Sequence, residues 1–238
     1  MTDPTSERRR RLAELARAYR LFGALRFGDL GDGHITARDP ERTDHMWLLR
    51  HEVSFDRATV DELVLVAPDG TATTPSGEPA AINITAHYIH HPIHQARPDL
   101  VSAAHTHTPW GTPFAAERRP IEPISQESTV FFEDHALFDD EEVQVLGLDG
   151  GGRIASALGD RTSVILANHG LLTTGTSVAA AVGLFVMMER VAEVHIKARE
   201  AKPISAIAAR RTRDNLLRGD LGSATFEWLT MRHLGDRG

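Results

Sequence analysis

The stretch Ala103-Ala104-His105-Thr106-His107-Thr108-Pro109 closes an apolar run that follows the turn signal Arg97-Pro98-Asp99. The run predicts a short buried strand. Side chains two positions apart on a strand point to the same face, so we expect His105 and His107 side by side. Two imidazoles on one rigid face supply two of the three or four ligands that catalytic zinc or iron needs. The alternative is a polar strand end in a chain with 13 histidines.

A second apolar run, residues 163–167, ends in Asn168-His169-Gly170-Leu171. A histidine at a strand end, followed by a glycine that permits a tight turn, is well placed to supply a third nitrogen. Three neutral imidazoles with an open coordination position can polarise a carbonyl group or hold a water. Together the two runs predict a metal site made of His105, His107 and His169.

The composition excludes several classes of protein. The 238 residues are 41% hydrophobic and 25% charged, with a net charge of −7, which argues against a protein that binds a phosphate backbone. Four arginines at positions 8–11 precede apolar residues at helical spacing, so we interpret them as the solvated start of a helix. The chain has no cysteine, which excludes disulfides and thiolate chemistry. Without a signal-peptide pattern or a membrane-length apolar run, we expect a cytoplasmic protein with no membrane partner.

The remaining periodicities predict one mixed α/β domain over residues 1–238. The expected helices are 6–27, most of 81–96, a short one from the glycines at 150–152 to Gly159, and 178–201. The expected strands are 34–38, 46–49, 63–66 and 126–132, besides the two runs above. A tail begins at about residue 203, and its Phe226, Trp228 and Leu229 are expected to dock on the rest of the protein.

Four histidines of the helix-compatible segment 81–96 share one broad face, at the spacing i, i+3, i+4 and i+7: His87, His90, His91 and His94. The pattern favours a packing face with partly solvated histidines over a set of ligands. Pro92 is expected to start, kink or break this segment.

Motifs spread over roughly residues 10–200 resemble, in order, those of the class II aldolase/adducin family. They are Gly33-His34-Ile35-Thr36-Ala37-Arg38-Asp39-Pro40, Ile89-His90, Ala96-Arg97-Pro98-Asp99, the His-Thr-His-Thr of 105–108, and Asn168-His169-Gly170-Leu171-Leu172. The family includes fuculose-phosphate and rhamnulose-phosphate aldolases, ribulose-phosphate 4-epimerase, the non-catalytic adducin head and decarboxylase-like bacterial members.

The resemblance implies a single α/β/α domain around a largely antiparallel sheet, commonly assembled as a homotetramer with active sites between subunits. It also implies that His105, His107 and His169 hold one divalent metal ion per subunit, usually zinc, with iron or manganese as alternatives. Adducin-type heads have lost catalysis, but all three ligand positions are histidine here, which indicates a metal-competent chain.

Two departures from the family pattern affect the expected chemistry. The acid/base glutamate of the sugar-phosphate aldolases corresponds to Ala86, and Glu78 is eight residues too early to replace it. The phosphate-binding pattern is also altered, since His34 occupies the position of an asparagine. We therefore expect a small non-phosphorylated carbonyl compound as substrate. The candidate substrate-binding residues are His34, Thr36, Ser76 and Gln126.

Two residues are candidates to replace the missing glutamate. Glu127 lies where epimerase-like members place active-site residues contributed by a neighbouring subunit, although an exposed strand glutamate is the alternative interpretation. His87, next to Ala86, is the reserve candidate because an imidazole titrates near neutral pH.

Three function classes remain open. The first is a metal-dependent carbon–carbon lyase, for aldol cleavage or decarboxylation through a stabilised enolate. The second is a non-haem iron oxygenase acting on an arylpyruvate-like or hydroxy-acid substrate in secondary metabolism. The third is an adducin-like module without catalysis. In all three the expected partners are other copies of the chain and, for the enzymes, a small molecule, with no nucleic acid. The metal that copurifies with the protein would separate the first two classes.

Overall fold

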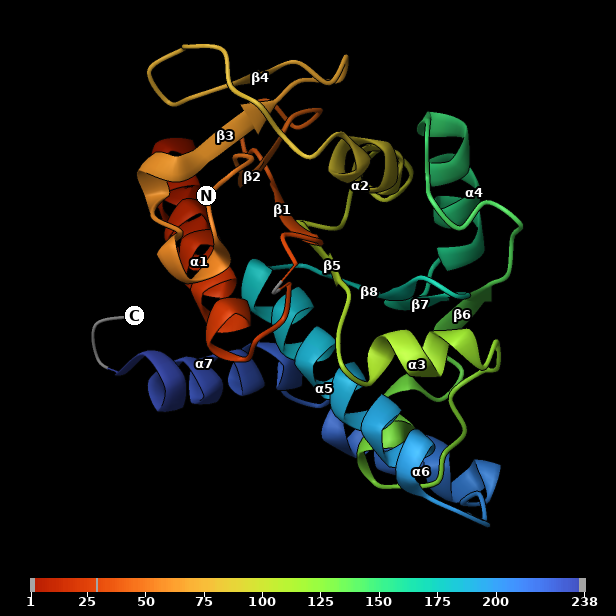
Figure 1. Cartoon of the computed structure of the whole chain (residues 1–238). Helices are drawn as coiled ribbons and strands as arrows, with labels where there is room; N and C mark the ends of the chain where they lie inside the picture. Colours follow the sequence, from red (N-terminus) through yellow and green to blue (C-terminus); the bar gives the residue numbers. More distant parts are fainter. Residues whose placement is uncertain (1–2, 29, 236–238) are drawn as a thin grey trace.

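A computed structural model describes residues 3–28 and 30–235 of the chain. These residues contain an eight-stranded sheet in the order β4-β3-β2-β1-β5-β8-β7-β6 (Figure 1). The strands are β1 (His34–Arg38), β2 (Met46–Leu49), β3 (Leu63–Val66), β4 (Ala72–Thr73), β5 (Ser102–Thr106), β6 (His135–Phe138), β7 (Ser163–Leu166) and β8 (Gly170–Gly175). Neighbouring strands are antiparallel except β6 and β7. The predicted α/β fold with a largely antiparallel central sheet is confirmed.

Helices cover both faces of the sheet (Figure 1). They are α1 (Pro4–Ala24), α2 (Ile84–Ala96), α3 (Gly111–Ala116), α4 (Leu148–Leu158), α5 (Val178–Lys197), α6 (Ala206–Leu216) and α7 (Leu221–Leu234), with 3-10 turns η1 (Phe55–Arg57), η2 (Val60–Glu62) and η3 (Glu127–Phe131). Helices α1, α3 and α5 pack on one face, with α7 against α1 and α5, while α2 and α4 pack together on the other. An apolar core therefore forms on each side, one including Phe22 and Phe185 and the other Ile89 and Ile154.

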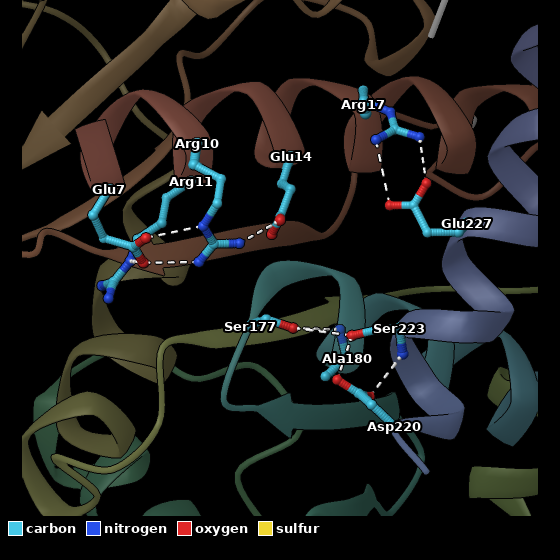
Figure 2. Close-up of polar contacts among 10 residues, drawn as sticks. All are labelled: Glu7, Arg10, Arg11, Glu14, Arg17, Ser177, Ala180, Asp220, Ser223 and Glu227. Carbon is cyan, nitrogen blue, oxygen red and sulfur yellow. Dashed lines mark hydrogen bonds and ion pairs between the residues drawn. The ribbon is translucent and has the colours of Figure 1, made fainter. Parts of the chain in front are cut away.

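Side-chain caps and ion pairs define the ends and contacts of α1, α5 and α7 (Figure 2). The side chains of Ser177 and Asp220 accept hydrogen bonds from backbone N–H groups in the first turns of α5 and α7. Arg17 of α1 pairs with Glu227 of α7 at 2.9 Å. In the arginine run of α1, Arg10 and Arg11 both pair with Glu7. The interpretation of this run as the start of a helix is confirmed.

The strand predicted over 126–132 is wrong, because this segment forms η3 and the strand comes later, at β6. The physical reason is local side-chain bonding to the backbone. The hydroxyls of Ser125 and Ser128 each accept the other residue's backbone N–H, and Thr129 donates its hydroxyl to the carbonyl of Gln126. These bonds curl the chain and offer the backbone an alternative to strand pairing.

The tail beyond residue 203 forms two helices, α6 and α7, where the sequence predicted only a docked segment. Phe226 docks with no exposed surface, and Leu229 packs against the same core. Trp228 stays 66% exposed, because it lies on the opposite side of α7 from Phe226. Within residues 3–28 and 30–235, no helix is both long enough and apolar enough to cross a membrane.

Pro92 lies inside α2, so the prediction that it starts or breaks the segment is wrong. Because proline has no N–H, the carbonyl of Tyr88, four residues earlier, loses its helical donor. That carbonyl faces Gly151 of α4, where an added Cβ would lie 1.8 Å from the oxygen. The missing side chain at Gly151 therefore permits α2 and α4 to approach closely.

Two adjacent glycines of α4 should respond oppositely to substitution by alanine. Gly151→Ala places a methyl group against the Tyr88 carbonyl and should destabilise the fold by about 1–3 kcal/mol, the range for overpacking. Gly152→Ala is the matched control, since no described atom outside the adjoining residues and backbone of α4 lies within 4 Å of its added Cβ. Alanine is the better helix former there, by about 1 kcal/mol. Urea unfolding measures both, and equal effects would contradict the close α2–α4 contact.

Candidate metal centre

Three histidines from two parts of the chain meet at one end of the central strands β5, β7 and β8. His105 is on β5, His107 directly follows that strand, and His169 lies in the turn between β7 and β8. One ligand nitrogen from each ring lies within 4.8 Å of the other two. The ring centroids are 4.7 Å apart for His105 and His169, and 4.9 Å for His107 and His169. The cluster can hold a metal ion.

Hydrogen bonds orient two of the three rings. The His105 Nδ1 lies 2.8 Å from the carbonyl of Leu171 and donates to it. The His107 Nδ1 lies 2.9 Å from the carboxylate of Asp32. In both rings this leaves the Nε2 lone pair free, which is the usual arrangement of metal-binding histidines. Asp32 was not singled out by sequence reasoning, although it lies in the glycine-rich loop that precedes His34.

The backbone around the cluster takes unusual conformations that bring these groups together. Asn168 has a φ of 57°, in the left-handed region that asparagine tolerates better than most residues, just before His169. Gly33 has a φ of 88°, and a Cβ there would lie 2.3 Å from the side chain of Thr106. Thr106 also donates its hydroxyl to the Asp32 carbonyl at 3.1 Å. A glycine at 33 therefore permits the loop to carry Asp32 to His107.

Burial keeps the inner rings of the cluster neutral. It lowers the pKa of His105 well below its usual value and that of His169 to about 4. Neutral imidazole is the form that binds a metal ion. The cluster is thus in its binding form at neutral pH without having to release protons from these two rings.

Glu189 of α5 anchors the segment that leaves His107. Its carboxylate accepts hydrogen bonds from the Thr108 hydroxyl at 2.5 Å and from the backbone N–H groups of Trp110 and Gly111 at 2.9 and 2.6 Å. Burial raises the pKa of Glu189. Sequence reasoning missed this residue, for which the available signal was a glutamate among the apolar residues of a long helix.

Two neighbouring cavities give access to the cluster. One, of about 450 Å³, is lined by the three histidines and also by Asp32 and Thr85. The other, of about 530 Å³, is lined by aromatic and apolar side chains, among them Tyr19, Phe27 and Phe55, and by charged or titratable ones of both signs, Arg50, His51, Glu52 and Asp56. Gly33, His34 and Asn83 line both cavities. The two cavities are therefore neighbours that meet at His34.

Only one of the four predicted substrate-binding residues lines these cavities within a single chain. His34 lies on the wall that they share. Thr36 is fully buried behind it, with its hydroxyl near His90 and His94. Ser76 is exposed in the turn after β4, where its hydroxyl lies 2.8 Å from that of Thr74. For Thr36 and Ser76, contact with a substrate stays a prediction.

The predicted acid/base residues also lie apart from the cluster in one chain. Gln126 and Glu127 are exposed at η3, which packs against α5 and α6, and neither is among the described residues that line the two cavities. His87 is buried, stacked on His91 with ring centroids 5.0 Å apart, and lies outside both linings as described. Ala86 faces an apolar cluster. A role for Glu127 therefore requires a second copy of the chain.

Comparisons with known proteins identify the family and the fold. The family described as Class II Aldolase and Adducin N-terminal domain matches residues 13–196. The chain is 38% identical over 215 residues to a 4-hydroxy-3-prenylphenylpyruvate oxygenase/4-hydroxy-3-prenylbenzoate synthase from Streptomyces roseochromogenus, covering 89% of this chain and 75% of that protein. It is 37% identical to decarboxylase NovR from Streptomyces niveus, covering 89% and 77%. The structure of L-fuculose 1-phosphate aldolase from Glaciozyma antarctica superposes with a TM-score of 0.83 at 30% identity, covering 98% and 93%.

Proposed function

Because the chain belongs to the class II aldolase and adducin family, we propose that it is a metal-dependent carbon–carbon lyase. It cleaves a small, non-phosphorylated carbonyl compound, by aldol cleavage or decarboxylation. The observation that carries the proposal is the cluster of His105, His107 and His169 in a cavity that can admit a ligand. A divalent ion bound there, zinc first and iron or manganese as alternatives, would act as a Lewis acid on a carbonyl oxygen.

The protein's own groups have separate tasks in this proposal. Asp32 and the Leu171 carbonyl hold two ligand rings with their Nε2 atoms free. His34 lines the wall next to the cluster, with its ring centroid 5.2 Å from that of His105, and can contact the substrate.

The second cavity supports a substrate with an apolar substituent. Its aromatic side chains can bury a hydrocarbon or aryl group. Its charged side chains are of both signs, and Arg50 is paired with Glu62, so they do not by themselves select an anion. The names of the two Streptomyces relatives refer to a phenylpyruvate oxygenase and a decarboxylase. We therefore place aryl-substituted 2-oxo acids first among the substrates to be tested.

The oxygenase remains the second candidate, because a relative with 38% identity carries that name. Imidazole ligands suit iron as well as zinc. The adducin-like alternative is less well supported, since a non-catalytic module has no need for a histidine cluster in a cavity.

The test is turnover of a panel of 2-oxo acids by protein loaded with zinc, manganese or ferrous iron, with and without oxygen. We expect release of carbon dioxide or of an aldehyde under anaerobic conditions, and its loss when a chelator removes the metal. Oxygen consumption in proportion to product would instead support the oxygenase. Absence of turnover with every metal and substrate, by protein that binds metal, would support the non-catalytic alternative.

A further inference from the structure

A chain of buried hydrogen-bonding groups leads from the cavity wall into the layer between β1 and α2. His34 Nδ1 lies 2.7 Å from His90 Nε2, and His90 Nδ1 lies 2.8 Å from the Thr36 hydroxyl. The same hydroxyl lies 2.9 Å from His94 Nε2. All four side chains are at most 5% exposed. The short distances leave no room for water between the members.

The number of protons available to these four side chains limits the directions in which their hydrogen bonds can point. Among the described residues, no carboxylate hydrogen-bonds to the buried rings of His34, His90 and His94, so each ring is neutral and carries one N–H. If each link uses one proton, all links must point the same way. Either every group donates towards the cavity, or every group donates away from it.

At the His34 end of this series of hydrogen bonds, the contacts favour donation towards the cavity. The Thr85 backbone N–H donates to Asn83 Oδ1 at 3.1 Å, which fixes the orientation of that amide. The Thr85 hydroxyl then donates its only proton to the same oxygen, at 2.7 Å. Towards His34 Nε2, at 3.4 Å, the Thr85 hydroxyl can therefore only accept. This contact, which is long, favours the proton of His34 on Nε2 without fixing it there.

At the His94 end of the series, the contacts also favour donation towards the cavity. His94 Nδ1 is buried without a hydrogen-bond partner among the described residues. Donation away from the cavity would put a proton on this atom. The Leu100 carbonyl interacts with the His94 ring, but it makes no hydrogen bond of good geometry with Nδ1, so this N–H would be poorly paired, which folded proteins tolerate less well than an unpaired acceptor. In the middle of the chain, Thr36 has a competing acceptor in the Ala103 carbonyl, but at 3.5 Å against 2.8 Å for His90 Nδ1.

We propose that Thr36, His90 and His94 are positioning residues that hold His34 in its Nε2–H tautomer. His34 then presents an N–H donor at the wall shared by the two cavities. Its contact with the Thr85 hydroxyl is long, at 3.4 Å, so an oxygen of a ligand bound beside the histidine cluster can share this proton. That the ligand is a carbonyl substrate rests on the proposed lyase function, whereas the tautomer does not. A donor fixed in advance at such an oxygen stabilises negative charge that develops there.

The tautomer is measured directly by solid-state NMR of ¹⁵N-histidine-labelled, metal-free protein, since a protonated and a bare ring nitrogen resonate far apart. The signals of His34 are identified by their loss in His34→Gln. We expect His34 to be protonated on Nε2 alone in the unaltered protein. In Thr36→Val, which removes the hydroxyl at nearly constant shape, the proton should be shared between Nε2 and Nδ1. Thr36→Ser should restore the original spectrum, because it restores the hydroxyl.

Thr174→Val is the matched control, because Thr174 lies opposite Ala103, the strand partner of Thr36, and its hydroxyl bonds to the Thr162 carbonyl instead. It should leave the His34 signals unchanged. If Thr36→Val does not fold, His94→Phe removes the inner donor while keeping a ring, and the same mixture is expected. A proton on His34 Nδ1 in the unaltered protein would overturn the proposal. So would an unshared Nε2 proton in folded Thr36→Val or His94→Phe, whatever turnover assays show about the lyase.

Discussion

Protein with His105→Ala is expected to lose stoichiometric metal binding while it remains folded, and the same holds for His107→Ala and His169→Ala. Each ring supplies one of three ligand nitrogens, and two nitrogens leave too few bonds for a stable site. Any metal-dependent turnover should be lost with the ion. Elemental analysis of the purified variants measures metal content, and circular dichroism reports the fold.

Two further variants calibrate this prediction. His233→Ala changes an exposed histidine of α7 and should leave the metal content unchanged. Asp32→Asn keeps the shape of the group beside His107 Nδ1 but removes its charge, and should weaken metal affinity by about 10–100-fold. Full metal content in His169→Ala would remove this residue from the ligand set.

The second large effect is expected for Glu127→Gln, which should lower turnover by about 10²–10⁴-fold, the usual contribution of a general acid or base. Glutamine keeps the size of the side chain and removes its titratable charge, so the metal content should stay unchanged. His87→Gln should lower turnover much less, because His87 is buried against His91, away from the histidine cluster. Steady-state kinetics with the best substrate of the panel measures both variants.

This prediction depends on assembly, since Glu127 is exposed and lies outside the described linings of both cavities of its own chain. We propose a homotetramer in which η3 of one copy completes the site of another. Exposed apolar residues support a further interface, with Trp228 66% and Met231 57% exposed on α7. A monomer by light scattering at micromolar concentration would contradict the role of Glu127. Normal turnover of Glu127→Gln together with an inactive His87→Gln would reverse the two assignments.

Local sequence patterns were sufficient to predict those parts of the structure that depend on a single helix or strand. The H-x-H of β5 places two rings on one side because alternation is a property of every strand. Likewise, the spacing of apolar residues predicted α1 and α5 to within a few residues of their observed ends. The strand predicted over 126–132 failed because the bonds between Ser125 and Ser128 compete with strand pairing, and periodicity does not register such bonds.

The sequence by itself determined the family, the α/β class and which three histidines form the cluster. These features depend on motifs and on the period of one strand or helix. Only the tertiary structure decided what surrounds them. The registers of β1 against β5 and of α2 against β1 bring His34 beside His105 and join His90 and His94 through Thr36. Likewise, the contact of α5 with the segment after β5 brings Glu189 to Thr108. These contacts join residues 54–81 positions apart, and such pairs depend on the packing of whole elements.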